Sequence, residues 1–420
     1  MISIPRFLAL TVALLSATGL HSAIPSAVAR WEFSAETTST WTEEHKVCDK
    51  TGAGTLSFEG AAPKFHRSRN GSISVSNVKA DDCFLLSAAV PVLPKDTEVD
   101  MSVYLGTDKE GGPGEWACEY FDGKTWQQVG EFTVKKYEQT NETCFVRSFQ
   151  LNRKLKGGSL QVRVRCMKDA ENPAARAYLM PSPRYGAYLA AWPKKSHGSL
   201  RVLILGNSAT YFGGSYLALM EIAHSQGNRI SMGVNLKGGQ TFGQHLKLER
   251  TLSTIAEGNY DAAILQDHSG AATSYVKDPV QNASVMENCK ILASQVRKFS
   301  PSCRLILEHR WAMPKNDWYG YGSAEAFDAD LTRGTALLAE GMQAEMSPLG
   351  PAFALGREAG LPLYWKDNAH PSVLGAYLKA CVNYLVLFGE PFVEPVSDYG
   401  LDPAQAAKCR EIAEKIVFKR

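Results

Sequence analysis

The chain has 420 residues, of which 45% are hydrophobic and 21% are charged, values typical of a globular protein with two or three domains. The net charge is only +2 and no basic block is present, which argues against a nucleic-acid partner. Aromatic residues are plentiful and low-complexity stretches are absent, so extensive disorder is excluded.

The first residues have the features of a targeting segment. Arg6 supplies a positive charge, Phe7 to Leu20 form an apolar run, and Pro25 precedes the small residues at 27–29. This pattern predicts a secretory signal peptide over residues 1–29, with a retained membrane anchor as the alternative. No later segment has the roughly 18 consecutive apolar residues that a spanning helix needs. We therefore expect a secreted or periplasmic protein, with no membrane contact after cleavage.

Nine cysteines are present, and none forms a Cys-x-x-Cys pair, so neither a zinc ribbon nor a redox dithiol is indicated. In an oxidising compartment the default expectation is disulfide formation. Plausible local pairs are Cys289 with Cys303 and Cys381 with Cys409. The spacing alone does not fix the connectivity, which stays open.

Residues 30–190 have the pattern of β-structure. Apolar residues alternate with polar ones over 99–105 and again over 160–166, and Asp122-Gly123 is a hairpin-turn signal. Short strands separated by turns predict a jelly-roll-like β-sandwich. In its architecture this region resembles the accessory modules that are attached to secreted carbohydrate-active enzymes.

Three aromatic residues of this region, Trp116, Tyr120 and Trp126, would stack on sugar rings if they were exposed. The favoured alternative is that they pack inside the sandwich or against its hairpin. Residues 191–200 are polar and are interrupted by Pro193 and Gly198, which indicates a linker between two domains.

From residue 201 to 420, strands and helices alternate. Strands are expected at 202–205, 229–236, 260–265 and 305–307, and a short fifth strand near 349–353. Helices are expected near 214–226, 243–256, 280–298 and 323–346, with two more after Ser372 and Asp402. Repeated βα units predict a parallel sheet covered on both faces, a flavodoxin-like three-layer α/β/α domain.

The first strand of this domain runs directly into Gly206-Asn207-Ser208. Ser208 thus occupies a strand-to-helix turn, where open α/β sheets place reactive groups. The alternative is that Asn207 and Ser208 only turn the chain and cap a helix.

A second stretch, from Asp367 to His370, enters the helix that begins near Ser372. A carboxylate three residues before a histidine on a turn can hold one imidazole nitrogen and leave the other free as a base. Isolated Asp-x-x-His sequences are common, so the pattern gains weight only together with Ser208.

Two further turns follow strand ends. Gly238-Gly239 follows the second strand and offers backbone N–H groups to a ligand, with Gly239 preferred over Gly238. Gln266-Asp267 ends the third strand, where the Gln266 amide is expected to donate to an oxyanion. The alternative is that Gln266 satisfies loop backbone.

Together these motifs resemble those of the SGNH hydrolases, also called GDSL-like esterases and lipases. The resemblance covers residues 201–395 and implies Ser208 as nucleophile, His370 as base and Asp367 as its orienting carboxylate. It also implies an oxyanion hole formed by the N–H groups of Ser208 and Gly239. Two departures place this chain in a divergent branch: Asn207 replaces an aspartate, and Gln266 stands where the family has asparagine.

Four residues are expected to line the pocket: Asn207, Asp267, His309 and Trp311. The leading expectation is a secreted serine esterase that acts on acylated carbohydrate or another small ester, without cofactor. The alternative is a catalytically impaired protein that serves as a carbohydrate-binding or adhesion module. The histidines lack metal-ligand spacing, so no metal site is predicted, and the oligomeric state stays open.

Overall fold

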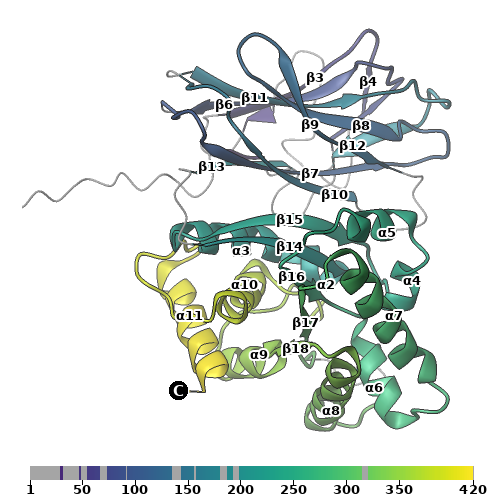
Figure 1. The fold of residues 1–420 in the computed structure, drawn as a ribbon, viewed down its shortest axis with the longest axis vertical. Helices are drawn as coiled ribbons and strands as arrows, with labels where there is room; N and C mark the ends of the chain where they lie inside the picture. Colours follow the sequence, from purple (N-terminus) through teal and green to yellow (C-terminus); the bar gives the residue numbers. More distant parts are fainter. Residues whose placement is uncertain are drawn as a thin grey trace, which may run out of the picture.

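The computed structural model consists of two antiparallel β-sheets followed by an α/β domain (Figure 1). It describes residues 29–31, 47–48, 54–66, 73–90, 92–134, 143–155, 158–179, 187–192, 198–314 and 320–419. The expected signal peptide falls outside the described residues except for Ala29, and so does much of the expected linker. Within the described part of the chain, no helix is long and apolar enough to cross a membrane.

The N-terminal half is a β-sandwich, as its alternating pattern predicted. One sheet contains β1 (Ala29–Trp31), β4 (Lys64–His66), β5 (Ile73–Ser76), β7 (Glu98–Thr107), β10 (Thr143–Gln150), β12 (Arg176–Leu179) and β13 (Ala187–Trp192). The other contains β2 (Val47–Cys48), β3 (Gly54–Glu59), β6 (Cys83–Val90), β8 (Glu115–Phe121), β9 (Trp126–Thr133) and β11 (Gly158–Cys166). Alternate residues of both sheets point inward and form one apolar core.

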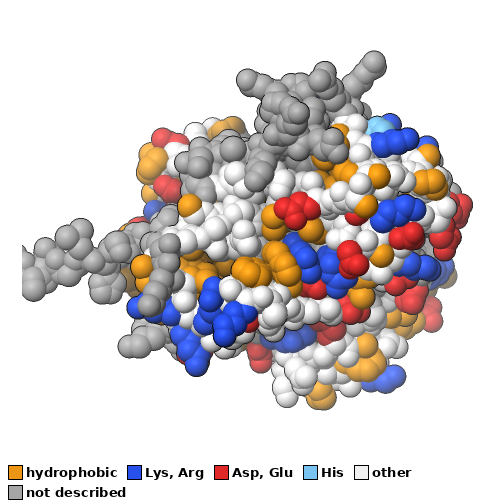
Figure 2. Space-filling view, turned by 90° about the horizontal axis from the view of Figure 1, so that it is seen from above, with side chains coloured by type: hydrophobic (Ala, Val, Ile, Leu, Met, Phe, Trp, Pro, Cys, Tyr) orange, Lys and Arg blue, Asp and Glu red, His pale blue; other side chains and the backbone are white. Residues whose placement is uncertain are grey.

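The aromatic residues of the sandwich do not form an open platform. Trp116 is fully buried and Tyr120 is 7% exposed. Trp126 is partly buried, and the Arg163 guanidinium lies 4.2 Å from the centre of its ring. In the view from the sandwich end, basic and acidic side chains are intermingled (Figure 2). These aromatic residues therefore pack inside the sandwich or against its hairpin, as the favoured alternative predicted.

The second domain has a five-stranded parallel sheet in the order β15-β14-β16-β17-β18. The strands are β14 (Ser199–Gly206), β15 (Arg229–Leu236), β16 (Ala262–Leu265), β17 (Arg304–Glu308) and β18 (Glu345–Ser347). The second strand in sequence lies outside the first, which is the flavodoxin-like order, so the predicted fold class is confirmed. The order reverses between β14 and β16, where such sheets open a crevice at their carboxyl ends.

Helices cover both faces of this sheet (Figure 1). On one side lie α3 (Ser215–Ser225), α9 (Leu349–Glu358), α10 (Val373–Phe388) and α11 (Pro403–Phe418). On the other lie α4 (Phe242–His245), α5 (Glu249–Ala256), α6 (Ser269–Lys277), α7 (Ala283–Phe299) and α8 (Ala324–Met342). The short helix α2 (Ser208–Tyr211) and a 3₁₀ turn, Phe212–Gly214, follow β14 directly.

One strand expectation was wrong. The apolar residues 349–353 belong to α9, and the fifth strand lies earlier, at Glu345–Ser347. Helix α8 ends because Gln343 adopts a left-handed conformation with φ of 52°. Pro351 is tolerated in the first turn of α9, where backbone N–H groups have no partner within the helix.

The expected disulfides are also absent from the described residues. Cys289, Cys303, Cys381 and Cys409 are free thiols, and all four are buried. Burial raises the pKa of Cys303 and of Cys409 to about 12, because the thiolate loses its hydration. These cysteines therefore behave as small apolar core residues.

The sandwich packs against the edge strand β15 of the parallel sheet, with β10 nearest to it (Figure 1). Val146, Tyr188 and Ala190 of the sandwich belong to the apolar core of the second domain. Charged groups reinforce the contact, because Arg229 pairs with Glu98 across it. The two halves thus share buried surface.

Candidate active site

Three side chains from two distant segments of the second domain form a hydrogen-bonded chain. Ser208 begins α2 immediately after β14, and its Oγ lies 2.8 Å from His370 Nε2. His370 Nδ1 lies 2.6 Å from Asp367 Oδ2. A carboxylate can only accept, so Nδ1 carries the proton and Nε2 is left to accept the serine proton. The arrangement has the order nucleophile, base and orienting acid.

The Asp367 to His370 loop is organised by its own backbone. Asp367 Oδ1 accepts the N–H groups of Ala369 at 2.9 Å and of His370 at 3.0 Å. Asn368, between Asp367 and Ala369, adopts a positive φ of 56°, a conformation that asparagine tolerates. The Trp365 N–H donates to the His370 carbonyl at 2.8 Å and closes the loop. The imidazole is therefore fixed before any substrate arrives.

The Asp367 carboxylate is held in its ionised form. Partial burial acts to raise its pKa, but the hydrogen bonds from His370 and from two backbone N–H groups outweigh that effect. The pKa of Asp367 is therefore below its ordinary value. One face of the His370 ring is covered by Phe212, whose ring centre lies 4.1 Å away at 20°. Sequence reasoning missed Phe212, which follows α2 without a motif of its own.

The turn that holds Ser208 is built around Asn207. Its Oδ1 accepts the Ala209 N–H at 3.2 Å, which caps α2, and its Nδ2 donates to the Gln240 carbonyl at 3.0 Å. An aspartate could cap α2 but could not donate to Gln240. Asn207 is 4% exposed, so it supports the turn from inside and does not line an open pocket, which corrects that expectation.

Two backbone N–H groups are available for an oxyanion. Among the hydrogen bonds of the described residues, none uses the N–H of Ser208 or of Gly239. Gly239 is the exposed third residue of a turn closed by the Gln240 N–H to the Lys237 carbonyl at 3.3 Å. Its φ of 68° is a conformation that favours glycine, whereas Gly238 has no positive φ. The preference for Gly239 over Gly238 as the oxyanion donor stays a prediction.

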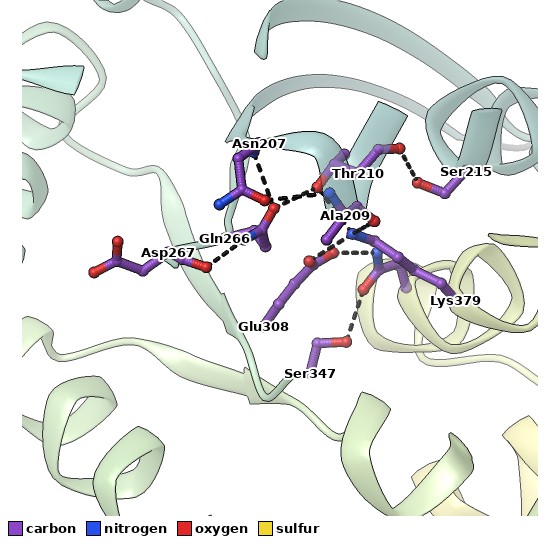
Figure 3. Close-up of polar contacts among 10 residues, drawn as sticks. Asn207, Ala209, Thr210, Ser215, Gln266, Asp267, Glu308, Ser347 and Lys379 are labelled. Atoms are coloured by element: carbon purple, nitrogen blue, oxygen red, sulfur yellow. Dashed lines mark hydrogen bonds and ion pairs between the residues drawn. The ribbon is translucent and has the colours of Figure 1, made fainter. Parts of the chain in front are cut away.

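Gln266 does not face the oxyanion position, and that expectation is corrected. It is 1% exposed and lies under the Ser208 turn (Figure 3). Its Oε1 accepts the Asn207 N–H at 3.0 Å and the Thr210 hydroxyl at 3.1 Å, and its Nε2 donates to the Asp267 carbonyl. Exchanging the amide atoms would leave both a donor and an acceptor without partners, so this orientation is the satisfied one.

The other expected pocket residues also act from inside. Trp311 is fully buried, stacks on Phe353 at 4.1 Å and donates from Nε1 to the Ala369 carbonyl at 3.3 Å. His309 is 1% exposed, its Nε2 lies 3.1 Å from Thr332 Oγ1, and burial lowers its pKa to about 4. Neither side chain lines an open pocket. Trp311 instead supports the loop that carries His370.

Asp267 is half-buried beside the turn. Its Oδ1 accepts the N–H groups of Phe242 at 2.9 Å and of His268 at 2.7 Å. Burial raises its pKa to about 6, although these hydrogen bonds oppose the shift. Asp267 lines a small cavity together with His268, Glu308 and Arg310. Asp267 thus borders a cavity, as expected of a pocket-lining residue.

His245 contacts the residue at the start of the turn. Its Nε2 lies 3.0 Å from the Gly206 carbonyl and its Nδ1 lies 3.0 Å from Thr251 Oγ1. A carbonyl only accepts, so Nε2 carries a proton, and burial lowers the pKa of His245 to about 4, which keeps the ring neutral near pH 7. In the part of the chain that the structure describes, no group of three His, Cys, Asp or Glu side chains could hold a metal ion.

The sequence matches no protein-family model and no curated protein. Among solved structures, a DUF4886 family protein from Bacteroides uniformis is 17% identical with a TM-score of 0.46, covering 53% of this chain and 96% of that one. A putative SGNH hydrolase from Slackia heliotrinireducens is 20% identical with a TM-score of 0.37, covering 45% and 99%. The acetylxylan esterase Axe2 from Geobacillus stearothermophilus is 16% identical with a TM-score of 0.36, covering 48% and 98%.

Proposed function

We propose that this protein is a serine esterase of the SGNH type that removes short acyl groups, such as O-acetyl, from carbohydrate. The observation that carries the proposal is the hydrogen-bonded chain from Ser208 Oγ through His370 to Asp367, with distances of 2.8 and 2.6 Å. A serine hydroxyl is a weak nucleophile unless a positioned base takes its proton. The chain supplies that base and the carboxylate that orients it.

The reaction proceeds in two steps. His370 Nε2 takes the Ser208 proton as Oγ attacks the ester carbonyl, and the N–H groups of Ser208 and Gly239 hold the oxyanion. The carbon–oxygen bond to the sugar then breaks, and His370 returns the proton to the leaving alkoxide. Water attacks the acyl-enzyme with His370 again as base, which releases the carboxylic acid and restores Ser208. Asp367 stays ionised and stabilises the imidazolium.

A carbohydrate substrate is supported by the surroundings of the triad. Ser208 is partly exposed, and a side chain at Gly239 would meet no atom within 4 Å, so the approach is open. Trp365, on the same loop as His370, is 37% exposed and offers an apolar face of the kind that packs on a sugar ring. We also propose that residues 1–29 direct export of the protein to the compartment in which such polymers are found.

The test is hydrolysis of 4-nitrophenyl acetate by the wild type and by Ser208→Ala. We expect a loss of kcat on the order of 10³-fold or more, because the nucleophile is gone. Ser253→Ala is the matched control, since Ser253 Oγ donates only within its own helix to the Arg250 carbonyl. Acetate release from an O-acetylated polysaccharide then tests the substrate class. Full activity in Ser208→Ala would refute the mechanism.

A further inference from the structure

A buried ion pair lies directly behind the turn that carries Ser208 (Figure 3). Lys379 of α10 and Glu308 at the end of β17 have side chains that are 1% and 0% exposed, and Lys379 Nζ lies 2.7 Å from Glu308 Oε2. A buried ion pair is often no more stable than apolar residues of the same volume, so stability alone does not explain it. Its contacts indicate a different role.

Lys379 connects the ion pair to the residues that follow the serine. Besides Glu308, its Nζ donates to Thr210 Oγ1 at 2.9 Å and to the Ala209 carbonyl at 3.4 Å. Thr210 passes the connection on, because its hydroxyl donates to Gln266 Oε1 at 3.1 Å. Gln266 in turn accepts the Asn207 N–H at 3.0 Å. The residues on both sides of Ser208 are thus tied to one buried network.

The far end of the network is anchored in the sheet and in α10. Asn383, one turn after Lys379, donates from Nδ2 to Glu308 Oε1 at 2.9 Å. Ser347, the last residue of β18, donates to Asn383 Oδ1 at 2.7 Å. Every residue in this network is buried. The Ser208 turn is therefore braced against two strands and a helix that carry no catalytic group.

We propose that Lys379 and Glu308, acting through Thr210, are positioning residues that hold Ser208 in hydrogen-bonding reach of His370. The inference rests on the proposed esterase function. None of these side chains touches the substrate. They fix the Ala209 carbonyl and the Thr210 side chain, and so fix the direction in which Ser208 Oγ and its N–H point. A displacement of about 1 Å at a reacting atom can cost about 10²-fold in rate, so this rigidity has catalytic consequences.

Thr210→Val tests the link, because valine keeps the shape and removes only the hydroxyl. We expect kcat for 4-nitrophenyl acetate to fall about 10- to 100-fold with KM changed by less than about 3-fold. Labelling of Ser208 by a fluorophosphonate should slow by the same factor. Thr210→Ser restores the hydroxyl and should return kcat to within about 3-fold of wild type. A merely structural role would lower the folded fraction and leave kcat per folded molecule unchanged.

The pair itself is tested with the double variant Lys379→Met/Glu308→Gln, which removes both charges and leaves no charge buried alone. It should show the same loss of kcat as Thr210→Val. The matched control is Glu345→Gln, which breaks the Arg304–Glu345 pair, whose charged atoms lie 2.8 Å apart. Arg304 and Glu345 are the first residues of β17 and β18, at the end of each strand far from Glu308 and Ser347. That control should retain wild-type kcat. Wild-type kcat in both Thr210→Val and the double variant would overturn the inference.

Crystal structures of the wild type and of Thr210→Val separate this inference from the proposed function. The Ser208 Oγ to His370 Nε2 distance is 2.8 Å with the network intact. It should exceed about 3.5 Å in the variant, beyond hydrogen-bond length. An unchanged distance together with unchanged labelling contradicts the positioning role. An inactive, unlabelled wild type contradicts the esterase function instead, and the distance still decides the positioning role.

Discussion

Asn207 differs from the aspartate of the family that the sequence resembles, and its contacts explain the difference. One amide both caps α2 at the Ala209 N–H and donates to the Gln240 carbonyl, which brings the Ser208 turn and the Gly239 turn together. A carboxylate would lose the second bond. The departure therefore fits the neighbouring loops and does not by itself indicate a lost activity.

Asn207→Asp should accordingly leave the esterase active within about 10-fold, because the cap on α2 remains. Its free energy of unfolding should fall by about 1–3 kcal/mol, since the Gln240 carbonyl loses a buried donor. Urea unfolding and 4-nitrophenyl acetate kinetics on the same preparations check both expectations. A drop in activity as large as that of Ser208→Ala would show that Asn207 acts in the chemistry itself.

The elements that carry the triad could be predicted because their signals are local. A buried apolar run that stops at Gly206 marks a strand end, and Ser372 before an apolar stripe marks the start of α10. The direction of Gln266 could not be predicted, because its partners lie on other strands and loops. Lys379 was missed for the same reason: α10 is buried on nearly all sides, and only Glu308 on β17 explains a lysine there.

At the level of elements, replacing one partner of the ion pair between α10 and β17 should lower the free energy of unfolding strongly. Replacing both partners together should lower it only slightly. Lys379→Met alone leaves the Glu308 carboxylate buried without its cation and should lower the free energy of unfolding by about 3–5 kcal/mol. The double variant with Glu308→Gln should recover most of that loss. A double-mutant cycle in urea measures the coupling. Additive effects of the two changes would contradict the tight pairing.

The whole molecule places the proposed active site at one end of a parallel sheet, and the sandwich packs against the edge strand of that sheet. Arg147 of β10 pairs with Glu257 at 2.9 Å, and Val146 beside it enters the core of the α/β domain. The sandwich lies against β15. Ser208 instead follows β14, and Asp367 and His370 lie in the loop before α10. The sandwich therefore supports the parallel sheet from an edge strand.

The stability of the molecule should fall with acidification. His245 and His309 have pKa values of about 4 in the fold and take up a proton near 6.5 when unfolded, so their contribution is present above pH 6.5 and is lost as pH falls towards 4. At pH 5 the loss is about 2 kcal/mol for each histidine. Asp267, whose pKa is raised to about 6, acts in the opposite direction because its folded form binds the proton more readily.

Urea unfolding at pH 7.5 and at pH 5 measures this slope. We expect a net loss at pH 5, since two histidines outweigh one carboxyl group. His309→Gln should flatten the slope, and Asp267→Asn should steepen it. A wild-type stability that rises between pH 7.5 and 5 would contradict the assignment of neutral, buried histidines.

The most direct test of the central claim is to identify the residue that becomes covalently modified by a fluorophosphonate. Peptide mapping by mass spectrometry should find one adduct on Ser208, formed in the wild type and suppressed in His370→Ala, because the hydroxyl reacts only when His370 takes its proton. Modification of a different serine, or ester hydrolysis that continues while Ser208 stays unmodified, would contradict the account.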